Sequence, residues 1–248
     1  MMEQVIYPEE IEQAALNAWP GLQTLLYDRW VIRFAKGYTK RANSVTPLFA
    51  GQLPLEEKIA YCEALFARQN LPIVFRLPSF SADSAQLDQA LTERNYRQID
   101  LTNVQTLDLA TVSFAPTSAT VKIMTLRDWL HIFHQFEPKK ELATHQEMLL
   151  SIVPTCCPMV LEVAGKPVAC GLGVLDGTTF GLFDIITDAN ERRKGYGKQL
   201  VASLLSWAQQ NGAATAYLQV MVNNPGAIRL YESLGFRTLY RYWYRVQV

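Results

Sequence analysis

The residues best suited to chemistry form a basic, glycine-punctuated turn in the second half of the chain, Arg192-Arg193-Lys194-Gly195-Tyr196-Gly197. The turn follows an apolar run from Thr179 to Thr187, which predicts a buried strand, and precedes an amphipathic stretch, which predicts a helix. The first N–H groups of a helix have no partner within it and carry a partial positive charge. Glycine lets the backbone approach a ligand closely. We therefore expect this turn to bind an anionic group, most naturally a phosphate.

Two common phosphate-binding patterns do not fit this turn. A P-loop would need an earlier glycine and a Ser or Thr after Lys198, where the chain has Gln199. The dinucleotide fingerprint would need a third glycine three residues beyond Gly197, where the chain has Leu200. Because a Gly-x-Gly pair alone is a weak signal, the residues downstream must decide what the turn does.

A second pattern follows after the β-rich run 214–222. It reads Asn-x-x-Ala-x-x-Leu-Tyr-x-x-x-Gly-Phe and is carried by Asn224, Ala227, Leu230, Tyr231, Gly235 and Phe236. Together with the Arg-x-x-Gly-x-Gly spacing of residues 192–197, it resembles the two signatures of the GNAT N-acetyltransferase superfamily. Two patterns in the right order, one predicted strand apart, are far more specific than either alone.

The resemblance implies an acyl-CoA site, with acetyl-CoA as the expected cosubstrate. The pyrophosphate would be held by the backbone N–H groups of the loop, and the positive charge of Arg192 or Arg193 would add to its binding. The residues of this loop are Arg192, Arg193, Lys194, Gly195, Tyr196, Gly197 and Lys198. The pantetheine arm would pair like an added strand with the backbone of Ile185, Ile186 and Thr187. Asn224 matches the position that anchors the arm or the local loop.

The resemblance also implies direct attack of an amine on the thioester, so that catalysis is mostly positioning. Tyr231 matches the general acid that protonates the CoA thiolate, and the alternative is a core aromatic beside Leu230 and Leu234. For the base, Asp184 is the first candidate and Glu162 the second. Asp184 could instead only receive a salt bridge.

The first half contributes three polar residues on or beside apolar strands, namely Arg33, Arg41 and Asn43. One interpretation is a solvated strand face. The other is a polar wall that contacts the substrate, and such a wall would suit an acceptor with a carboxylate or another anionic group.

Composition limits the class of protein. Of 248 residues, 49% are hydrophobic and 19% charged, and Lys+Arg equals Asp+Glu at 23 each, so no overall charge favours nucleic acid. No run reaches the ~18 apolar residues of a membrane span, and the N-terminus lacks a signal pattern.

Four cysteines and three histidines show no metal-ligand spacing beyond His131-x-x-His134, so we expect no metal. The sequence therefore predicts a cytoplasmic monomer or homodimer with reduced thiols, without nucleic acid or membrane as a partner.

Periodicity predicts an α/β fold with a mixed sheet of the α+β kind. In the first half we expect a helix within 3–19, two strands around Gly37, a helix within 54–66, a strand at 71–77, a helix from 84 and a strand at 102–109. From residue 121 the order is β, α, α, β, β, β, α, β, α, β, which resembles the GNAT fold. In that fold, the strand before the loop and the strand after the helix splay apart to admit the pantetheine arm.

The two halves also resemble each other. The same layout occurs in 84–109 and in 227–246: a helix, a C-cap residue, an aromatic residue and a strand. In this alignment Asn95-Tyr96 corresponds to Gly235-Phe236, and Leu91 corresponds to Tyr231. The first half has no Arg-x-x-Gly-x-Gly turn. We therefore predict two GNAT-like domains in tandem: a degenerate one at 1–115 that forms a substrate wall, a linker at 116–120, and a catalytic one at 119–248. The whole chain resembles bacterial tandem-GNAT acetyltransferases of largely unassigned substrate.

Three functions follow from these patterns. The leading one is an acyl-CoA-dependent N-acyltransferase that acts on a primary amine of a small molecule or peptide. The second is a non-catalytic acyl-CoA-binding or sensing protein. The third is an interaction scaffold built on the first half, which predicts a large exposed apolar patch on residues 1–115.

Overall fold

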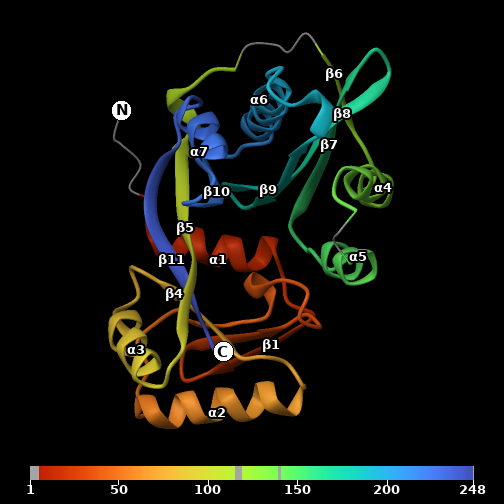
Figure 1. Ribbon diagram of the computed structural model, residues 1–248. Coiled ribbons are helices and arrows are strands. Elements are labelled where there is room, and N and C mark those ends of the chain that lie inside the picture. The colour runs from red at the N-terminus through yellow and green to blue at the C-terminus, as the bar shows by residue number, and fades with distance from the viewer. Residues whose placement is uncertain (1–5, 115–118, 139–140, 248) are drawn as a thin grey trace.

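A computed structural model describes residues 6–114, 119–138 and 141–247 of the chain (Figure 1). The described strands form one eleven-stranded mixed sheet in the order β1-β2-β3-β4-β11-β5-β10-β9-β8-β7-β6. Helices pack along this sheet from one end of the molecule to the other (Figure 1). The predicted α/β class with a mixed sheet is confirmed.

The first half alternates short strands with three helices and ends in a long strand. Its elements are α1 (Pro8–Ala18), β1 (Gln23–Tyr27), β2 (Trp30–Phe34), a 3-10 turn (Lys40–Ala42), β3 (Val45–Pro47), α2 (Leu55–Arg68), β4 (Val74–Pro78), α3 (Ala82–Glu93) and β5 (Arg97–Asp108). The strands predicted around Gly37 are β2 and β3, which pair antiparallel. A long loop with Gly37 at φ 77° joins them, rather than a tight turn.

Strand β1 was not expected from the sequence. It pairs antiparallel with β2 through the two-residue turn Asp28-Arg29. Both turn residues have positive φ, 42° and 67°. Tight hairpins of this kind usually carry Asn-Gly or Asp-Gly, so the ordinary sequence signal for a hairpin is missing here.

The second half follows the predicted order of elements. These are β6 (Thr120–Ile123), α4 (Leu126–Phe136), α5 (Leu142–Leu150), β7 (Thr155–Val163), β8 (Lys166–Asp176), β9 (Thr179–Thr187), α6 (Tyr196–Gln210), β10 (Thr215–Met221), α7 (Pro225–Glu232) and β11 (Arg237–Val246). Helix α6 buries one apolar face, formed by Leu200, Val201, Leu204, Leu205 and Ala208. Residues 116–118 of the predicted linker lie outside the described residues.

The two halves exchange strands. Strand β5, from the first half, lies between β10 and β11 and pairs antiparallel with both. The C-terminal strand β11 in turn pairs with β4 of the first half. Figure 1 shows β5 and β11 running side by side along the length of the molecule. Each half is completed by a strand from the other, and the division at 1–115 and 119–248 stays a prediction.

The ends of α3 and α7 have the same geometry. Asn95 and Gly235 both adopt the left-handed conformation that closes a helix, with φ 64° and 101°. After them, the N–H of Tyr96 donates to the carbonyl oxygen of Leu91 at 2.9 Å, and the N–H of Phe236 donates to that of Tyr231 at 3.1 Å. The sequence correspondence between the two segments is thus matched in the backbone, while a tandem duplication stays a prediction.

A buried ion pair fixes α1 against the sheet. Glu12 of α1 and Arg76 of β4 are both almost fully buried and paired with each other. Glu12 also accepts a hydrogen bond from the hydroxyl of Tyr240, and the Arg76 guanidinium lies 3.7 Å from the centre of the Tyr242 ring. Since an unpaired buried charge is costly, these contacts hold the first helix in one place beside β11.

Candidate active site

A cavity opens where two parallel strands separate. β9 and β10 pair from Thr179–Thr215 as far as Leu182–Leu218, and no pairing between the described residues of these strands continues beyond that point. The cavity has a volume of about 890 Å³ and is bordered by the diverging ends of both strands, by α7, and by residues from β5, β11 and the loop after β2. The divergence leaves the β10-facing edge of residues 183–187 available to a ligand.

A bulge in β9 brings Asp184 and Ile185 to this cavity. The register between β8 and β9 shifts between the Cys170–Ile186 and Leu172–Phe183 pairs, and Asp184 has φ 46°. Bulges of this kind re-aim side chains next to functional sites. Gly171 faces the bulge, and a Cβ there would come within 2.5 Å of Ile185 Cδ1. Asp184 and Ile185 both line the cavity.

The basic turn lies between the end of β9 and the start of α6. Arg193 and Gly195 are left-handed, with φ 65° and 82°, and Gly195 is the N-cap of α6. A Cβ on Gly197 would lie 3.2 Å from Thr187 Oγ1, so this glycine lets the first turn of α6 pack closely on β9. The predicted loop, residues 192–198, therefore places a helix N-terminus directly beyond the open edge of β9.

Helix α7 supplies the opposite wall. Asn224 caps this helix, and its side chain accepts a hydrogen bond from the N–H of Ala227 at 3.1 Å. Tyr231 lines the cavity and meets Phe236 edge-on, with ring centres 6.0 Å apart. Burial raises the pKa of Tyr231 to about 12, so the hydroxyl keeps its proton at neutral pH.

The three polar residues predicted in the first half have different surroundings. Arg41 lines the cavity, with its guanidinium 5.7 Å from the centre of the Trp19 ring. Arg33 is 2% exposed and donates to the backbone carbonyl oxygens of Leu16, Trp19 and Arg41. In the described part of the chain, Arg33 is not among the residues that border this cavity.

Asn43 organises the loop that carries the cavity wall. Its side-chain oxygen accepts from the N–H groups of Ala35 and Gly37, at 2.6 and 2.8 Å. Its amide donates to the carbonyl oxygen of Thr39 at 2.8 Å. Like Arg33, Asn43 holds the backbone around Arg41 and is not one of the described residues at the cavity.

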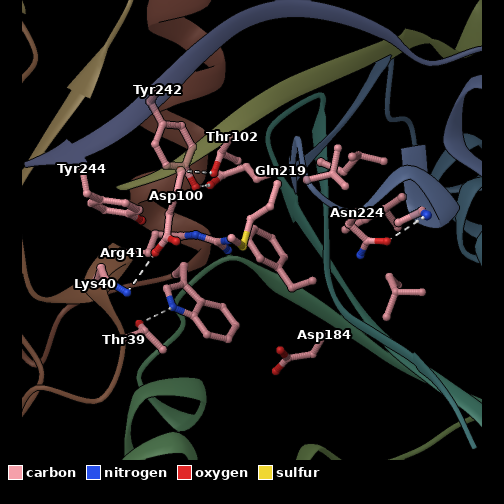
Figure 2. Close-up of a pocket in the computed structure, with 18 of the residues that line it drawn as sticks. Thr39, Lys40, Arg41, Asp100, Thr102, Asp184, Gln219, Asn224, Tyr242 and Tyr244 are labelled. Carbon is pink, nitrogen blue, oxygen red and sulfur yellow. Dashed lines mark hydrogen bonds and ion pairs between the residues drawn. The ribbon is translucent and has the colours of Figure 1, made fainter. Parts of the chain in front are cut away.

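Sequence reasoning missed a group of polar residues that line the cavity. Figure 2 shows Asp100 and Thr102 of β5, Gln219 of β10, and Tyr242 and Tyr244 of β11 around the same space as Arg41. The hydroxyl of Tyr242 donates to Gln219 Oε1 at 2.9 Å. These residues come together only through the exchanged strands, so no local spacing could have pointed to them.

The two candidate bases also differ in location. The Asp184 carboxylate lies at the cavity and its Oδ2 is 2.8 Å from Nε2 of His145. Glu162 is on β7 and forms an ion pair with Lys122 of β6 at 2.7 Å. Glu162 is not one of the described residues around the cavity.

No group of three or more His, Cys, Asp or Glu side chains in the described ranges is arranged to hold a metal ion. The four cysteines are free thiols. None of the described helices is long and apolar enough to cross a membrane.

Two strands that diverge beside a helix N-terminus, with a tyrosine on the helix opposite, define the class of GNAT N-acetyltransferases. Comparison with known proteins agrees. Residues 9–245 match the family described as "Probable histone acetyltransferase Rv0428c C-terminal", and the chain belongs to this family.

Relatives support the same class, and a solved structure has a similar fold. The chain is 27% identical over 249 residues to the "Uncharacterized N-acetyltransferase YobR" of Bacillus subtilis (strain 168), covering 96% of this chain and 98% of that protein. It is 42% identical over 73 residues to the "[Ribosomal protein bS18]-alanine N-acetyltransferase" of Escherichia coli (strain K12), covering 29% of this chain and 48% of that one. The fold is similar to that of a solved "GCN5-related N-acetyltransferase from Kribbella flavida", with a TM-score of 0.73, 13% identity, and coverage of 96% and 95%. The protein is therefore an N-acetyltransferase.

Proposed function

We propose that this enzyme transfers an acetyl group from acetyl-CoA to a primary amine of a small molecule or a peptide, with Tyr231 as the general acid. The observation that carries this proposal is the placement of the protonated Tyr231 hydroxyl and the Asp184 carboxylate on one cavity, at the point where β9 and β10 separate. A proton donor and a proton acceptor on one cavity suit a reaction that removes one proton from an amine and returns one to a thiolate.

The residues around the cavity fit acetyl-CoA. The edge of Ile185, Ile186 and Thr187 is not paired with β10 and suits the two amides of the pantetheine arm. The carbonyl oxygen of Thr187 accepts from Nε of Arg192 at 3.4 Å, a contact that the arm would replace. Beyond it, the N-terminus of α6 and the cationic side chains of Arg192 and Arg193 suit a diphosphate. Left-handed Gly195 is the N-cap of α6, whose first N–H groups have no partner within the helix.

The loop and α7 complete the proposed cosubstrate site. Lys194, Tyr196, Gly197 and Lys198 belong to the same turn as Gly195, and their backbone N–H groups would share in holding the diphosphate. Asn224 holds the first turn of α7 at the other side of the cavity, and thereby fixes the helix that carries Tyr231.

When bound, acetyl-CoA supplies a thioester carbonyl that a neutral amine can attack. Asp184 would take the proton of the acceptor ammonium, directly or through one water. Tyr231 would give its proton to the departing sulfur, and the raised pKa keeps that proton in place until the thiolate forms. The remaining catalytic contribution is the positioning of the two reactants in one cavity.

The acceptor would contact the part of the cavity built by the first half and by the exchanged strands. Arg41 suits a carboxylate or another anionic group of the acceptor, while Arg33 and Asn43 hold the backbone that carries it. This assigns residues 1–115 the role of a substrate wall and residues 119–248 the catalytic role. The Escherichia coli relative acts, by its name, on an alanine of a ribosomal protein, which makes a peptide N-terminus one acceptor to test.

The testing experiment measures release of free CoA thiol from acetyl-CoA across a panel of amines, amino acids and peptides. We expect turnover with one acceptor class, and a loss of ~10²-fold or more in kcat for Tyr231→Phe. Acetyl-CoA should still raise the melting temperature of the variant, because the hydroxyl is not needed for binding. Tyr231→Phe with unchanged kcat would remove the acid role, and a wild type that binds acetyl-CoA but never releases thiol would overturn the proposal.

A further inference from the structure

The carboxylate of Asp184 is the first member of a chain of three polar side chains that runs from the cavity into the protein. Asp184 Oδ2 lies 2.8 Å from Nε2 of His145, and Nδ1 of His145 lies 3.2 Å from Nε2 of His134. His145 of α5 is fully buried, whereas His134 of α4 is partly exposed. Two of the three histidines of the chain thus converge behind one residue of the proposed site.

Aromatic packing fixes the ring of His145. The Tyr38 ring stacks on it at 5.3 Å and 25°, the Phe133 ring meets it edge-on at 5.2 Å, and the Trp19 ring lies at 5.9 Å. Such a ring has little freedom to rotate, and it is shielded from bulk water. Nδ1 of His145 is hydrogen-bonded to His134, and Nε2 lies in short contact with the Asp184 carboxylate without the alignment of a hydrogen bond.

We propose that His145 is a positioning residue for acyl transfer: it holds the Asp184 carboxylate oriented toward the cavity, and His134 sets the tautomer of His145. This inference rests on the proposed function, in which Asp184 accepts the proton of the acceptor amine. The residues lie on three elements, β9, α5 and α4, and belong to neither of the two GNAT signatures in the sequence.

The arrangement determines where each proton lies. When Nδ1 of His145 accepts from the Nε2–H of His134, the proton of His145 is on Nε2, 2.8 Å from Asp184 Oδ2. The positive end of this N–H bond then lies beside the carboxylate, an electrostatic contact that holds it in place. When an acceptor ammonium is bound, its N–H bond breaks, the electron pair stays on nitrogen, and an O–H bond forms on Asp184. No other reactant is required.

Other titratable groups surround this chain and affect its pH dependence. Tyr38 and Cys170 face Asp184, and burial raises the pKa of both, so both stay neutral at physiological pH. Glu137 and Glu141 act on Tyr38 from the ends of α4 and α5. Hydrogen bonds from the side chain and N–H of Thr144 lower the pKa of Glu141.

The test compares two replacements of one ring. His145→Gln keeps an N–H near the position of Nε2, whereas His145→Phe keeps the aromatic packing but removes the donor. We expect His145→Phe to lower kcat by about tenfold or more and to change the acid side of the pH profile of kcat/KM, with the KM for acetyl-CoA within about twofold of wild type. His145→Gln should recover most of kcat. His131→Gln, on the exposed face of α4, is the control and should match wild type.

The outcomes separate this inference from the proposed function. Wild-type kcat and an unchanged pH profile in folded His145→Phe would overturn the positioning role, as would an equal loss in His145→Gln. A wild type without turnover on any amine would instead contradict the proposed function. Long-range ¹H–¹⁵N spectra of the histidine rings then still test the contact between His145 and Asp184. We expect His145 to be the Nε2–H tautomer and its signals to change in Asp184→Asn. An unchanged His145 spectrum in that variant would exclude the contact.

Discussion

The guanidinium of Arg33 donates a hydrogen bond to the backbone carbonyl oxygen of Arg41. One arginine therefore holds the chain segment that presents the other to the cavity. Arg33 lies under the wall, and Arg41 forms part of it. Two arginines that are alike in the sequence thus have different roles, and replacing them should affect different properties, namely stability and acceptor binding.

Arg33→Met should destabilise the fold, whereas Arg41→Met should weaken acceptor binding. Loss of the buried guanidinium leaves the carbonyl oxygens of Leu16, Trp19 and Arg41 without their donor, at a cost of roughly 3 kcal/mol or more in the free energy of unfolding. Urea unfolding measures this cost. Arg41→Met should unfold nearly like wild type and raise the acceptor KM. An Arg41 variant with wild-type KM for the best acceptor would remove its proposed role.

Gly195 and Gly212 provide a matched pair at the two ends of α6. Both are left-handed, with φ 82° and 85°, and a Cβ on either would have no atom closer than 4.0 Å. Alanine should therefore cost ~1–2 kcal/mol of backbone strain at each position. Only Gly195 lies in the proposed diphosphate turn. We expect Gly195→Ala to raise the Kd for acetyl-CoA about tenfold and Gly212→Ala to leave it unchanged, as measured by titration calorimetry. Equal Kd values for the two variants would contradict the assignment of the turn.

Residues 119–248 should not fold alone. In the sheet, β5 separates β10 from β11, so the isolated second half would have a gap where two strands need a partner. We expect this fragment to be insoluble or to unfold without a cooperative transition. Co-expression with residues 1–114 should restore a complex that co-purifies on one affinity tag. A soluble, cooperatively unfolding 119–248 fragment would show that the exchanged strand is dispensable.

Asp88 should make the protein less stable in acid. Its carboxylate, on α3, accepts hydrogen bonds from Arg245 at 2.7 and 2.8 Å and from Trp243, both on β11. Burial by itself raises the pKa of Asp88, but the hydrogen bonds from Arg245 and Trp243 and the charge of Arg245 outweigh it, so the pKa is below its usual value. The unfolded chain then binds this proton more readily than the folded one.

The sign of the effect follows from that difference. The contribution of Asp88 is complete above the unfolded pKa of ~3.9 and is lost as pH falls through the lower folded pKa. The free energy of unfolding, measured from pH 7 to pH 3, should thus decrease more steeply for wild type than for Asp88→Asn. Parallel curves for the two proteins would show that Asp88 does not contribute.

Much of the catalytic half could be predicted because its signals are local. The Gly-x-Gly turn and the helix end at Gly235 each depend on a few consecutive residues whose conformations their own chemistry restricts. The consecutive strands β7 and β8 were predicted as well, and Ala164 and Gly165 form the turn between them. Strand β1 was missed because Asp28 and Arg29 take up positive φ without a glycine.

The sequence by itself determined the fold class, the order of the elements in the second half and the turn proposed to bind the cosubstrate, because each is set by short-range periodicity and backbone preference. Tertiary structure alone decided which side chains share the cavity. It brought Asp100 of β5 and Tyr242 of β11 to one wall, buried Arg33 behind Arg41, and placed His145 behind Asp184. These contacts join residues far apart in the chain, and they arise from strand exchange and helix packing, whose free energy depends on the whole core rather than on any local pattern.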